Sequence, residues 1–246
     1  MKKVIKGLIL ASLLLGNTQL SADGVSYKSG VYAGALFGYS RMQTDFKSSY
    51  DVGGAGPAFS GREAPKAFQG NVTGSLFLGY RYLIQSIFLG VDCDLALYNN
   101  STSKDYSFST PGAPTPFGAR LQRHFSVTPS AVMGVTFLDN WNAFLKLGLG
   151  ISQFTLKVLN LTAPARHYTK TKTLFGFVPT LGVEYAVTQA ISVLGSVTYE
   201  WYPSIKRSVS GDELLPGVGA AGWTVEHGVS VKPRVFSVRM GVLFKV

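Results

Sequence analysis

The sequence predicts an all-β fold, a transmembrane eight-stranded antiparallel up-and-down β-barrel, from three observations. Apolar residues alternate with polar or small residues in eight separate segments, which is the period of a β-strand with two different faces. No run of about 18 apolar residues follows the N-terminal segment, so no helical membrane span is expected. Short and long connections alternate along the chain, as in barrels whose strands run up and down through a membrane.

The eight segments carry continuous apolar faces of similar length. In the last one, Phe236, Val238 and Met240 share one face, whereas Ser237 and Arg239 share the other. An apolar face of about ten residues suits a tilted strand that crosses roughly 30 Å of hydrocarbon. A soluble β-sandwich is the alternative, because its strands alternate as well, but its outer faces carry charge. The predicted strands cover residues 30–42, 71–83, 87–99, 124–138, 141–157, 173–187, 190–206 and 232–246.

Two prolines, Pro129 and Pro179, fall in the middle of predicted strands. A proline lacks the backbone N–H that a sheet ladder uses, so a central strand normally excludes it. We expect β-bulges at these positions to accommodate the rings.

The N-terminal segment has the features of a secretory signal peptide. Lys2, Lys3 and Lys6 precede a short apolar core, and Ala22 is the predicted cleavage residue. Residues 1–22 are therefore predicted to be removed, residues 23–29 to form a short periplasmic lead, and residues 30–246 to form the barrel. The order of short and long connections places both barrel ends in the periplasm of a bacterial outer membrane and four long loops outside the cell.

Several charged residues fall on the minority face and should point into the barrel. An eight-stranded barrel has an interior that side chains just fill, so these charges should form a paired network rather than line a wide channel. From the loop centres we expect Lys146 to pair with Glu184 and Glu200 with Arg239, and across the short turn at residues 84–86 we expect Arg81 to lie near Asp92. The predicted interior set is Arg81, Asp92, Asp94, Lys146, Glu184, Glu200 and Arg239.

The long loops and strand tops form a basic extracellular face. The whole chain carries a formal net charge of +10. A basic surface on an exported protein points to anionic partners, such as lipopolysaccharide phosphates or an anionic host-surface ligand, rather than to nucleic acid. The bases predicted to form this face are Arg62, Lys66, Arg120, Arg123, Arg166, Lys170, Lys172, Lys206 and Arg207.

Catalytic and metal-binding motifs are weak. The three histidines lack metal-ligand spacing, and no cofactor or metal is expected. His124-Phe-Ser126 resembles the His-x-Ser pair of lipid A deacylase barrels, in which a serine attacks an acyl ester. The match covers three residues, and no downstream orienting acid is evident. The sequence therefore predicts no enzyme activity.

Short motifs give the chain a family resemblance over about residues 30–246. Residues 32–40 (YAGALFGYS) resemble the first strand of the OmpA/OmpX/opacity-type superfamily of small outer-membrane barrels, and residues 79–81 (GYR) resemble its second strand. The final strand resembles the signal that the barrel assembly machinery reads, although this chain ends Phe244-Lys-Val246 without a terminal aromatic residue.

Together these features predict an outer-membrane barrel with a structural or surface-interaction, adhesin-like role, acting as a monomer. One alternative is a narrow porin for small solutes or ions. A second alternative is a barrel enzyme that modifies lipid A.

Overall fold

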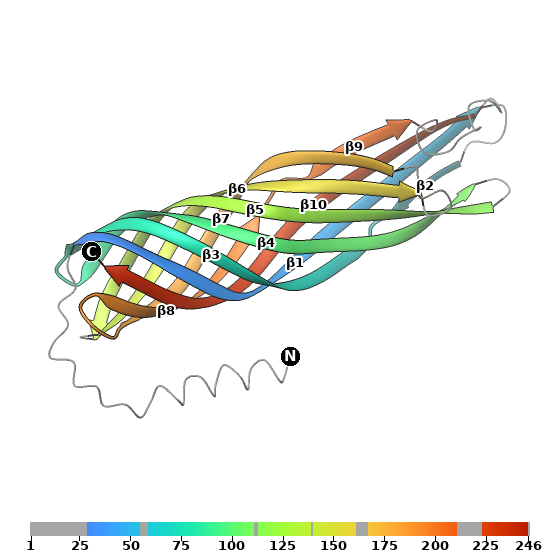
Figure 1. Cartoon of the computed structure of the whole chain (residues 1–246). Coiled ribbons are helices and arrows are strands. Elements are labelled where there is room, and N and C mark those ends of the chain that lie inside the picture. The colour runs from blue at the N-terminus through green and yellow to red at the C-terminus, as the bar shows by residue number, and fades with distance from the viewer. Residues whose placement is uncertain are drawn as a thin grey trace.

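The computed structural model describes residues 29–54, 59–110, 113–138, 140–160, 167–210 and 223–245, and these form an elongated β-barrel (Figure 1). No helix in this part of the chain is long and apolar enough to cross a membrane. The strands are β1 (Gly30–Gly54), β2 (Phe59–Glu63), β3 (Lys66–Ile84), β4 (Ile87–Thr110), β5 (Ala113–Leu138), β6 (Trp141–Asn160), β7 (His167–Ala186), β8 (Ile191–Trp201), β9 (Ile205–Ser210) and β10 (Trp223–Lys245).

Eight of these strands close a ring in the order β1-β3-β4-β5-β6-β7-β8-β10, with β10 pairing back onto β1. Every pairing is antiparallel, and Tyr32 near the start of β1 lies opposite Lys245 at the end of β10. β2 continues beside β1 beyond the end of β3, and β9 continues beside β10 beyond the end of β8. The predicted fold class, an antiparallel barrel of eight strands, is confirmed.

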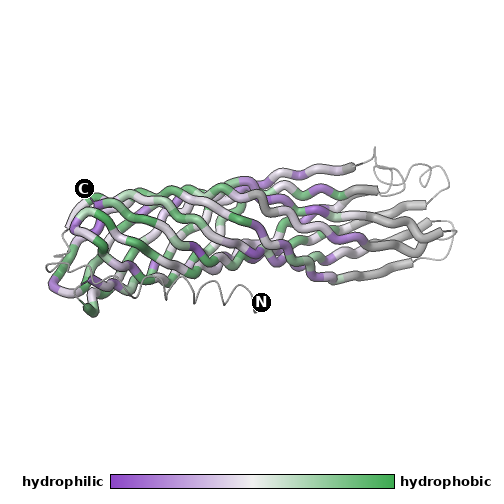
Figure 2. The backbone as a smooth tube through the Cα atoms, turned by 60° about the horizontal axis from the view of Figure 1, so that its bottom comes forward, coloured by the Kyte–Doolittle hydropathy of each residue, from purple (hydrophilic) through white to green (hydrophobic). Residues whose placement is uncertain are grey.

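One half of the barrel, which contains the start of β1 and the end of β10, presents a continuous apolar outer surface. Leu76, Leu97 and Leu181 are 63%, 67% and 64% exposed there, and Figure 2 shows the hydrophobic colour concentrated in this half. On β10 the apolar outer face covers residues 236–244, about 30 Å of strand. At a typical tilt of about 40° this spans roughly 23 Å, close to the apolar band of known outer-membrane barrels. We call this region the barrel half.

The other half reverses this arrangement, with apolar side chains inside and polar side chains outside. On β6, Leu156 and Val158 are fully buried while Lys157 between them is exposed. On β10, Val229 and Val231 are buried while Lys232 is exposed. We call this region the sandwich half, because its outer faces are polar as in a soluble β-sandwich. Its core comprises Met42, Phe46, Ala67, Ala119, Leu121, Phe154, Leu156, Val158, Leu174, Tyr202, Ile205, Val229, Val231 and Val235.

The sandwich half consists of two four-stranded sheets. The ladder between β3 and β4 ends at the pair Thr73 and Tyr98, and the ladder between β7 and β8 ends at Phe177 and Trp201. Beyond these pairs, β2 or β3, β1, β10 and β9 form one sheet, while β4, β5, β6 and β7 form the other. The hydroxyls of Thr44 on β1 and Thr102 on β4 meet across the core at 2.8 Å.

The segments expected to be long loops are largely strand. β4 and β5 continue as a ladder to the pair Thr110 and Ala113, where a long polar loop was predicted between residues 99 and 124. Where side chains are described in these segments, as at Ala119 and Leu121 beside Arg120, the apolar residues face the core and the polar residue between them faces water. The strand period therefore continues beyond the membrane-facing surface.

The bulges lie away from the two mid-strand prolines. Register shifts occur between Leu97 and Asn100 on β4, and at two places on β5. Pro129 instead sits in regular register opposite Cys93, and Pro179 opposite Leu147. The expectation of bulges at these prolines was wrong.

Candidate functional site

The barrel interior holds all seven charged residues that the sequence assigned to it. Six of them are buried, and the side chain of Lys146 is 13% exposed. Their neighbours on the inner faces are mostly small hydroxyl side chains, which leave space for long charged groups and hydrogen-bond to them. Buried charges of this kind need partners, because desolvating an unpaired charge costs several kcal/mol, on the order of 3–5.

The ion pairs differ from those expected. Arg81 pairs with Glu184 through two hydrogen bonds of 2.8 and 3.2 Å, rather than with Asp92. Lys146 binds Asp92 rather than Glu184. Lys245 lies 3.3 Å from Glu184, so the last described strand contributes a second cation to that carboxylate.

Arg239 occupies the middle of the interior and pairs with Asp94 rather than with Glu200. Its Nη1 lies 3.3 Å from Asp94 Oδ2 and donates to Ser75 Oγ at 3.0 Å. Its Nη2 donates to Thr198 Oγ1 at 3.1 Å. One guanidinium thus ties together β10, β4, β3 and β8 across the interior.

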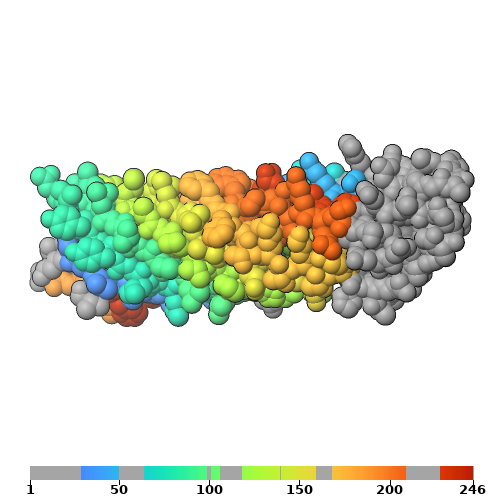
Figure 3. All heavy atoms as spheres, turned by 90° about the horizontal axis from the view of Figure 1, so that it is seen from above, coloured from blue at the N-terminus to red at the C-terminus, as the bar shows by residue number. Residues whose placement is uncertain are grey.

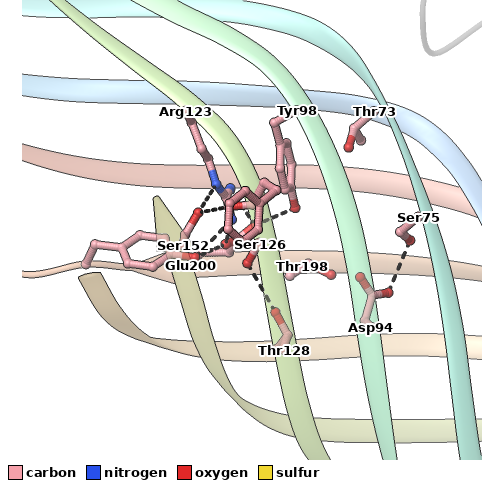
Figure 4. A network of polar contacts seen from close by, with 12 residues as sticks. Thr73, Ser75, Asp94, Tyr98, Arg123, Ser126, Thr128, Ser152, Thr198 and Glu200 are labelled. Atoms are coloured by element: carbon pink, nitrogen blue, oxygen red, sulfur yellow. Dashed lines mark hydrogen bonds and ion pairs between the residues drawn. The ribbon is translucent and has the colours of Figure 1, made fainter. Parts of the chain in front are cut away.

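A cluster around Arg123 and Glu200 lies where the barrel half meets the sandwich half (Figure 4). Arg123 is fully buried and donates to both Glu200 carboxylate oxygens, at 3.1 and 2.7 Å. Its guanidinium carbon lies 3.7 Å from the centroid of the Tyr98 ring, and its Nε donates to Ser152. The hydroxyls of Tyr98 and Tyr202 both donate to Glu200. Every hydrogen-bonding group of this ion pair therefore has a nearby partner.

Arg123 corrects the prediction for the basic extracellular face, since it points into the interior. A register shift between Arg123 and Ser126 on β5 changes which residues face inward. In the barrel half, after the shift, the even-numbered residues Ser126, Thr128 and Val132 are buried. In the sandwich half, before the shift, odd-numbered residues such as Leu121 are buried. Parity counted from the apolar segment alone therefore placed Arg123 on the wrong side.

Aromatic rings fill the interior at the end of the barrel half, where the start of β1 pairs with the end of β10. Phe77 lies over Gly34 and Phe88 over Gly134, and a Cβ at either glycine would come within 2.4 Å of a ring carbon. Each glycine is the cross-strand partner of the aromatic residue on the neighbouring strand, so its missing side chain leaves room for the ring. The buried cluster here comprises Tyr32, Leu36, Phe77, Phe88, Val132, Phe144, Leu194 and Leu243.

Between this cluster and the sandwich core, the interior has little free space. The cavity beside Asp94, Lys146 and Arg239 has a volume of about 20 Å³. This is enough for about one water molecule. Arg239 Nε and Ser196 Oγ are buried without a hydrogen-bond partner in the structure, and both residues line the cavity.

The exposed surface of the sandwich half, including the open edge between β7 and β9, is strongly basic. Of the predicted bases, Lys66, Arg120, Lys170, Lys172, Lys206 and Arg207 are exposed or half-exposed here. Arg166 and the side chain of Arg62 lie outside the described residues. Only two acids, Asp45 and Asp105, are described on the same surface, against twelve bases. The twelve bases are Arg41, Lys47, Lys66, Lys104, Arg120, Lys157, Lys170, Lys172, Lys206, Arg207, Lys232 and Arg234.

The His-x-Ser pair has separate partners. His124 Nε2 lies 3.1 Å from Thr155 Oγ1, while Ser126 Oγ lies 3.4 Å from Thr128 Oγ1 in the interior. The register shift on β5 falls between these positions and turns the two side chains into different surroundings.

Sequence comparison decides the family. Residues 8–241 match the model of the outer membrane protein beta-barrel domain. The chain belongs to this family. It is therefore a bacterial outer-membrane β-barrel protein, which accounts for the apolar outer surface of the barrel half. A comparison with curated proteins gives no match.

Solved structures share the fold at low sequence identity. The outer membrane protein OprG from Pseudomonas aeruginosa is 16% identical, with a TM-score of 0.51 over 91% of this chain and 100% of that one. The outer membrane protease OmpT from Escherichia coli is 8% identical, with a TM-score of 0.51 over 94% of this chain and 99% of that one. Neisserial surface protein A is 15% identical, with a TM-score of 0.39 over 84% and 97%. The first two likenesses show the outer-membrane barrel fold.

Proposed function

We propose that this protein is a surface-exposed outer-membrane protein whose sandwich half projects from the cell and engages anionic ligands. The observation that carries the proposal is the exposed surface of the sandwich half, with twelve described bases against two acids. A surface of one sign attracts oppositely charged partners and accelerates their encounter. The ladders of the sandwich half make this face a rigid platform rather than a set of loops.

The lengths of the connections support an orientation for the barrel. The connections at residues 85–86, 139–140 and 187–190 are short and all lie at the end of the barrel half. In outer-membrane barrels the short turns are periplasmic. The sandwich half then lies outside the cell, where its basic face meets lipopolysaccharide phosphates and any anionic host-surface ligand.

Assembly through the C-terminal strand fits the same orientation. β10 closes the ring against β1 over its whole described length, from Lys245 to Trp223. We propose that the barrel assembly machinery recognises the periplasmic end of β10, with Phe244 as its outward aromatic residue, and that the closed ring functions as a monomer.

The packed interior argues against the porin alternative. The aromatic cluster, the ion pairs and the sandwich core follow one another along the axis, and the cavity beside the ion pairs holds about one water. We therefore expect no discrete channel openings when the purified protein is inserted into planar bilayers. Reproducible single-channel steps would support the porin instead.

An enzymatic role is not part of the proposal. His124 and Ser126 hydrogen-bond to different residues, so they lack the direct contact through which a histidine activates a serine. Mass spectra of lipid A from cells that overproduce the protein should match those of control cells. A change in acylation that depends on Ser126 would favour the lipid A-modifying enzyme.

Anionic binding is tested with the refolded barrel in vesicles of neutral lipid. We expect dextran sulfate to co-sediment with the vesicles, to be released as salt rises, and uncharged dextran to stay in solution. The variant K66Q/K157Q/K232Q removes three outer-face charges and should weaken this binding. Equal retention of both polysaccharides would overturn the proposal, as would labelling in intact cells that places the sandwich half in the periplasm.

A further inference from the structure

The two sheets of the sandwich half meet along a seam between β7 and β9 that no ladder closes. The pairing of β7 with β8 ends at Phe177 and Trp201, and β9 pairs with β10 alone. The break lies at residues 202–204, where Tyr202 turns inward to Glu200 and Pro203 supplies no N–H. Figure 3 shows the orange residues of β9 beside the gold residues of β7 on one face of the molecule.

Side chains rather than backbone pairs bridge this seam. Lys170 Nζ donates to the carbonyl oxygen of Lys206 at 3.3 Å. The guanidinium carbon of Arg207 lies 4.3 Å from the centroid of the Tyr168 ring. Both contacts cross from β7 to β9, so the two strands stand close together with their facing edges unpaired by a ladder.

Three cations lie in the seam because they are on the inward faces of β7 and β9. Lys170 and Lys172 share the inward face of β7 with buried Leu174, and Arg207 shares the inward face of β9 with buried Ile205. In a closed barrel these charges would be forced into the apolar core. The open seam lets them reach solvent, so that Lys172 is exposed while Lys170 and Arg207 are half-buried.

Positive charge in the seam is not balanced by acids. The described side chains of β6, β7, β9 and β10 in the sandwich half include no Asp or Glu, and Arg207 Nε is buried without a hydrogen-bond partner. Elsewhere on this half a base does lie beside an acid, since Arg234 is 3.4 Å from Asp45. Lysines at an open sheet edge also prevent the strand from pairing with other chains. That role does not require three cations to lie together, nor the buried Nε of Arg207 among them.

The seam opens directly above the membrane-facing surface. Its lower end is the pair Phe177 and Trp201, whose rings stack 5.9 Å apart and 12° from parallel, with Tyr199 packed against Trp201. Aromatic rings of this kind mark the boundary between hydrocarbon and headgroups. Lys172 lies three residues beyond Phe175, the last exposed apolar residue of β7. The cations therefore stand at the level of the phosphates of the surrounding lipid.

We propose that this seam binds the phosphate of an outer-leaflet glycolipid. Lys170, Lys172 and Arg207 donate charge-assisted hydrogen bonds to the phosphate oxygens, and the Phe177–Trp201 pair packs beside the lipid below them. The inference rests on the proposed function for its orientation, because only then does the seam face the outer leaflet. It adds one defined lipid site to the general basic face.

The test compares two variants that remove the same charge from the same half. K170Q/K172Q/R207Q removes the three positive charges of the seam, whereas K66Q/K157Q/K232Q, the matched control, removes three positive charges from the outer face. Each purified barrel is refolded in detergent, and native mass spectrometry measures retention of bis-phosphorylated lipid A and of lipid A from which both phosphates were removed. An unchanged heat-dependent gel shift shows that a variant has folded.

We expect the seam variant to retain bis-phosphorylated lipid A at least about tenfold more weakly than the wild type, because two or more charge-assisted hydrogen bonds are lost. The control should stay within about twofold, and dephosphorylated lipid A should bind all three proteins alike. Equal losses in both variants would overturn the site in favour of the general basic face. No preference of the wild type for the phosphorylated lipid would overturn it outright.

The two proposals can fail separately. Loss of dextran sulfate binding in K66Q/K157Q/K232Q with unchanged lipid A retention in the seam variant would keep the proposed function and remove the seam site. Periplasmic labelling of the sandwich half in cells would instead remove the proposed function, even if the isolated seam bound lipid A.

Discussion

The two halves of this barrel have the same alternation of apolar and polar residues, but the apolar face points outward in one half and inward in the other. In the barrel half, leucine and phenylalanine face lipid while serine, threonine and paired charges fill the interior. In the sandwich half, the apolar residues face inward and lysines face water. The change occurs within single strands such as β6, without a turn. A strand period of two therefore identifies a strand but leaves open which of its faces meets water, lipid or core.

The cluster at the boundary between the halves should be the most sensitive point. Arg123→Ala leaves the Glu200 carboxylate buried without its guanidinium, and we expect a loss of about 3–5 kcal/mol in unfolding free energy. Denaturant unfolding in lipid vesicles, followed by tryptophan fluorescence, measures it. R123A/E200Q removes the stranded charge and should recover part of the loss. A cost below about 1 kcal/mol for R123A alone would show that this ion pair does not hold the halves together.

Truncating leucines on one strand should distinguish a core from a lipid surface. Leu156→Ala on β6 removes a fully buried side chain of the sandwich core and should cost about 2–5 kcal/mol, because a cavity remains. Leu149→Ala on the same strand faces lipid, which fills the space, and should cost about 1 kcal/mol. Equal costs for the two variants in the same unfolding assay would contradict the reversal of faces on β6.

Introducing a charge on the outer face should lower the unfolding free energy in the barrel half and leave it nearly unchanged in the sandwich half. Leu181 and Thr171 both lie on the outer face of β7, the first in the barrel half and the second in the sandwich half. Leu181→Lys should cost about 2–4 kcal/mol near the bilayer centre, whereas Thr171→Lys should stay within about 0.5 kcal/mol. Refolding yield into vesicles gives an independent readout. A large cost at Thr171 would mean that lipid reaches the sandwich half.

The partly exposed ion pair between Arg234 and Asp45 in the sandwich half should contribute least. Arg234 and Asp45 are 3.4 Å apart, with side chains 34% and 20% exposed. Arg234→Ala should therefore cost about 0–1 kcal/mol, and the effect should disappear at about 1 M salt. Unfolding at low and high salt checks this. A salt-independent loss would indicate that Arg234 acts through packing rather than charge.

Much of the barrel could be predicted from sequence because membrane-facing strands are long, uninterrupted and bounded by turn residues. The eight ring strands and the inward side of Asp92, Glu184 and Arg239 follow from the alternation, and the order of the strands follows from the up-and-down connections. The sandwich half was missed because Lys157 and Lys232 mark the ends of predicted strands, and the polar segments beyond them were assigned to loops. Only burial distinguishes a polar outer face from a polar loop.

The partners of the interior charges could not be predicted for a geometric reason. Arg81 on β3 and Glu184 on β7 lie on opposite walls, and long side chains meet across the interior rather than along adjacent strands. Estimates from loop centres compare neighbouring strands only. Arg123 was misplaced because the register shift on β5 changes parity, and no proline or glycine marks that position.

The reversal of faces is tested most directly by single nitroxide labels along β10. In a Cys93→Ala background, labels at Met240, Phe236, Arg234, Lys232 and Val231 report contact with oxygen, which concentrates in lipid, or with a water-soluble nickel complex. We predict that Met240 and Phe236 contact oxygen, that Arg234 and Lys232 contact nickel, and that Val231 contacts neither. Oxygen contact continuing to Lys232, or nickel contact at Val231, would contradict a membrane barrel that continues into a water-exposed sandwich.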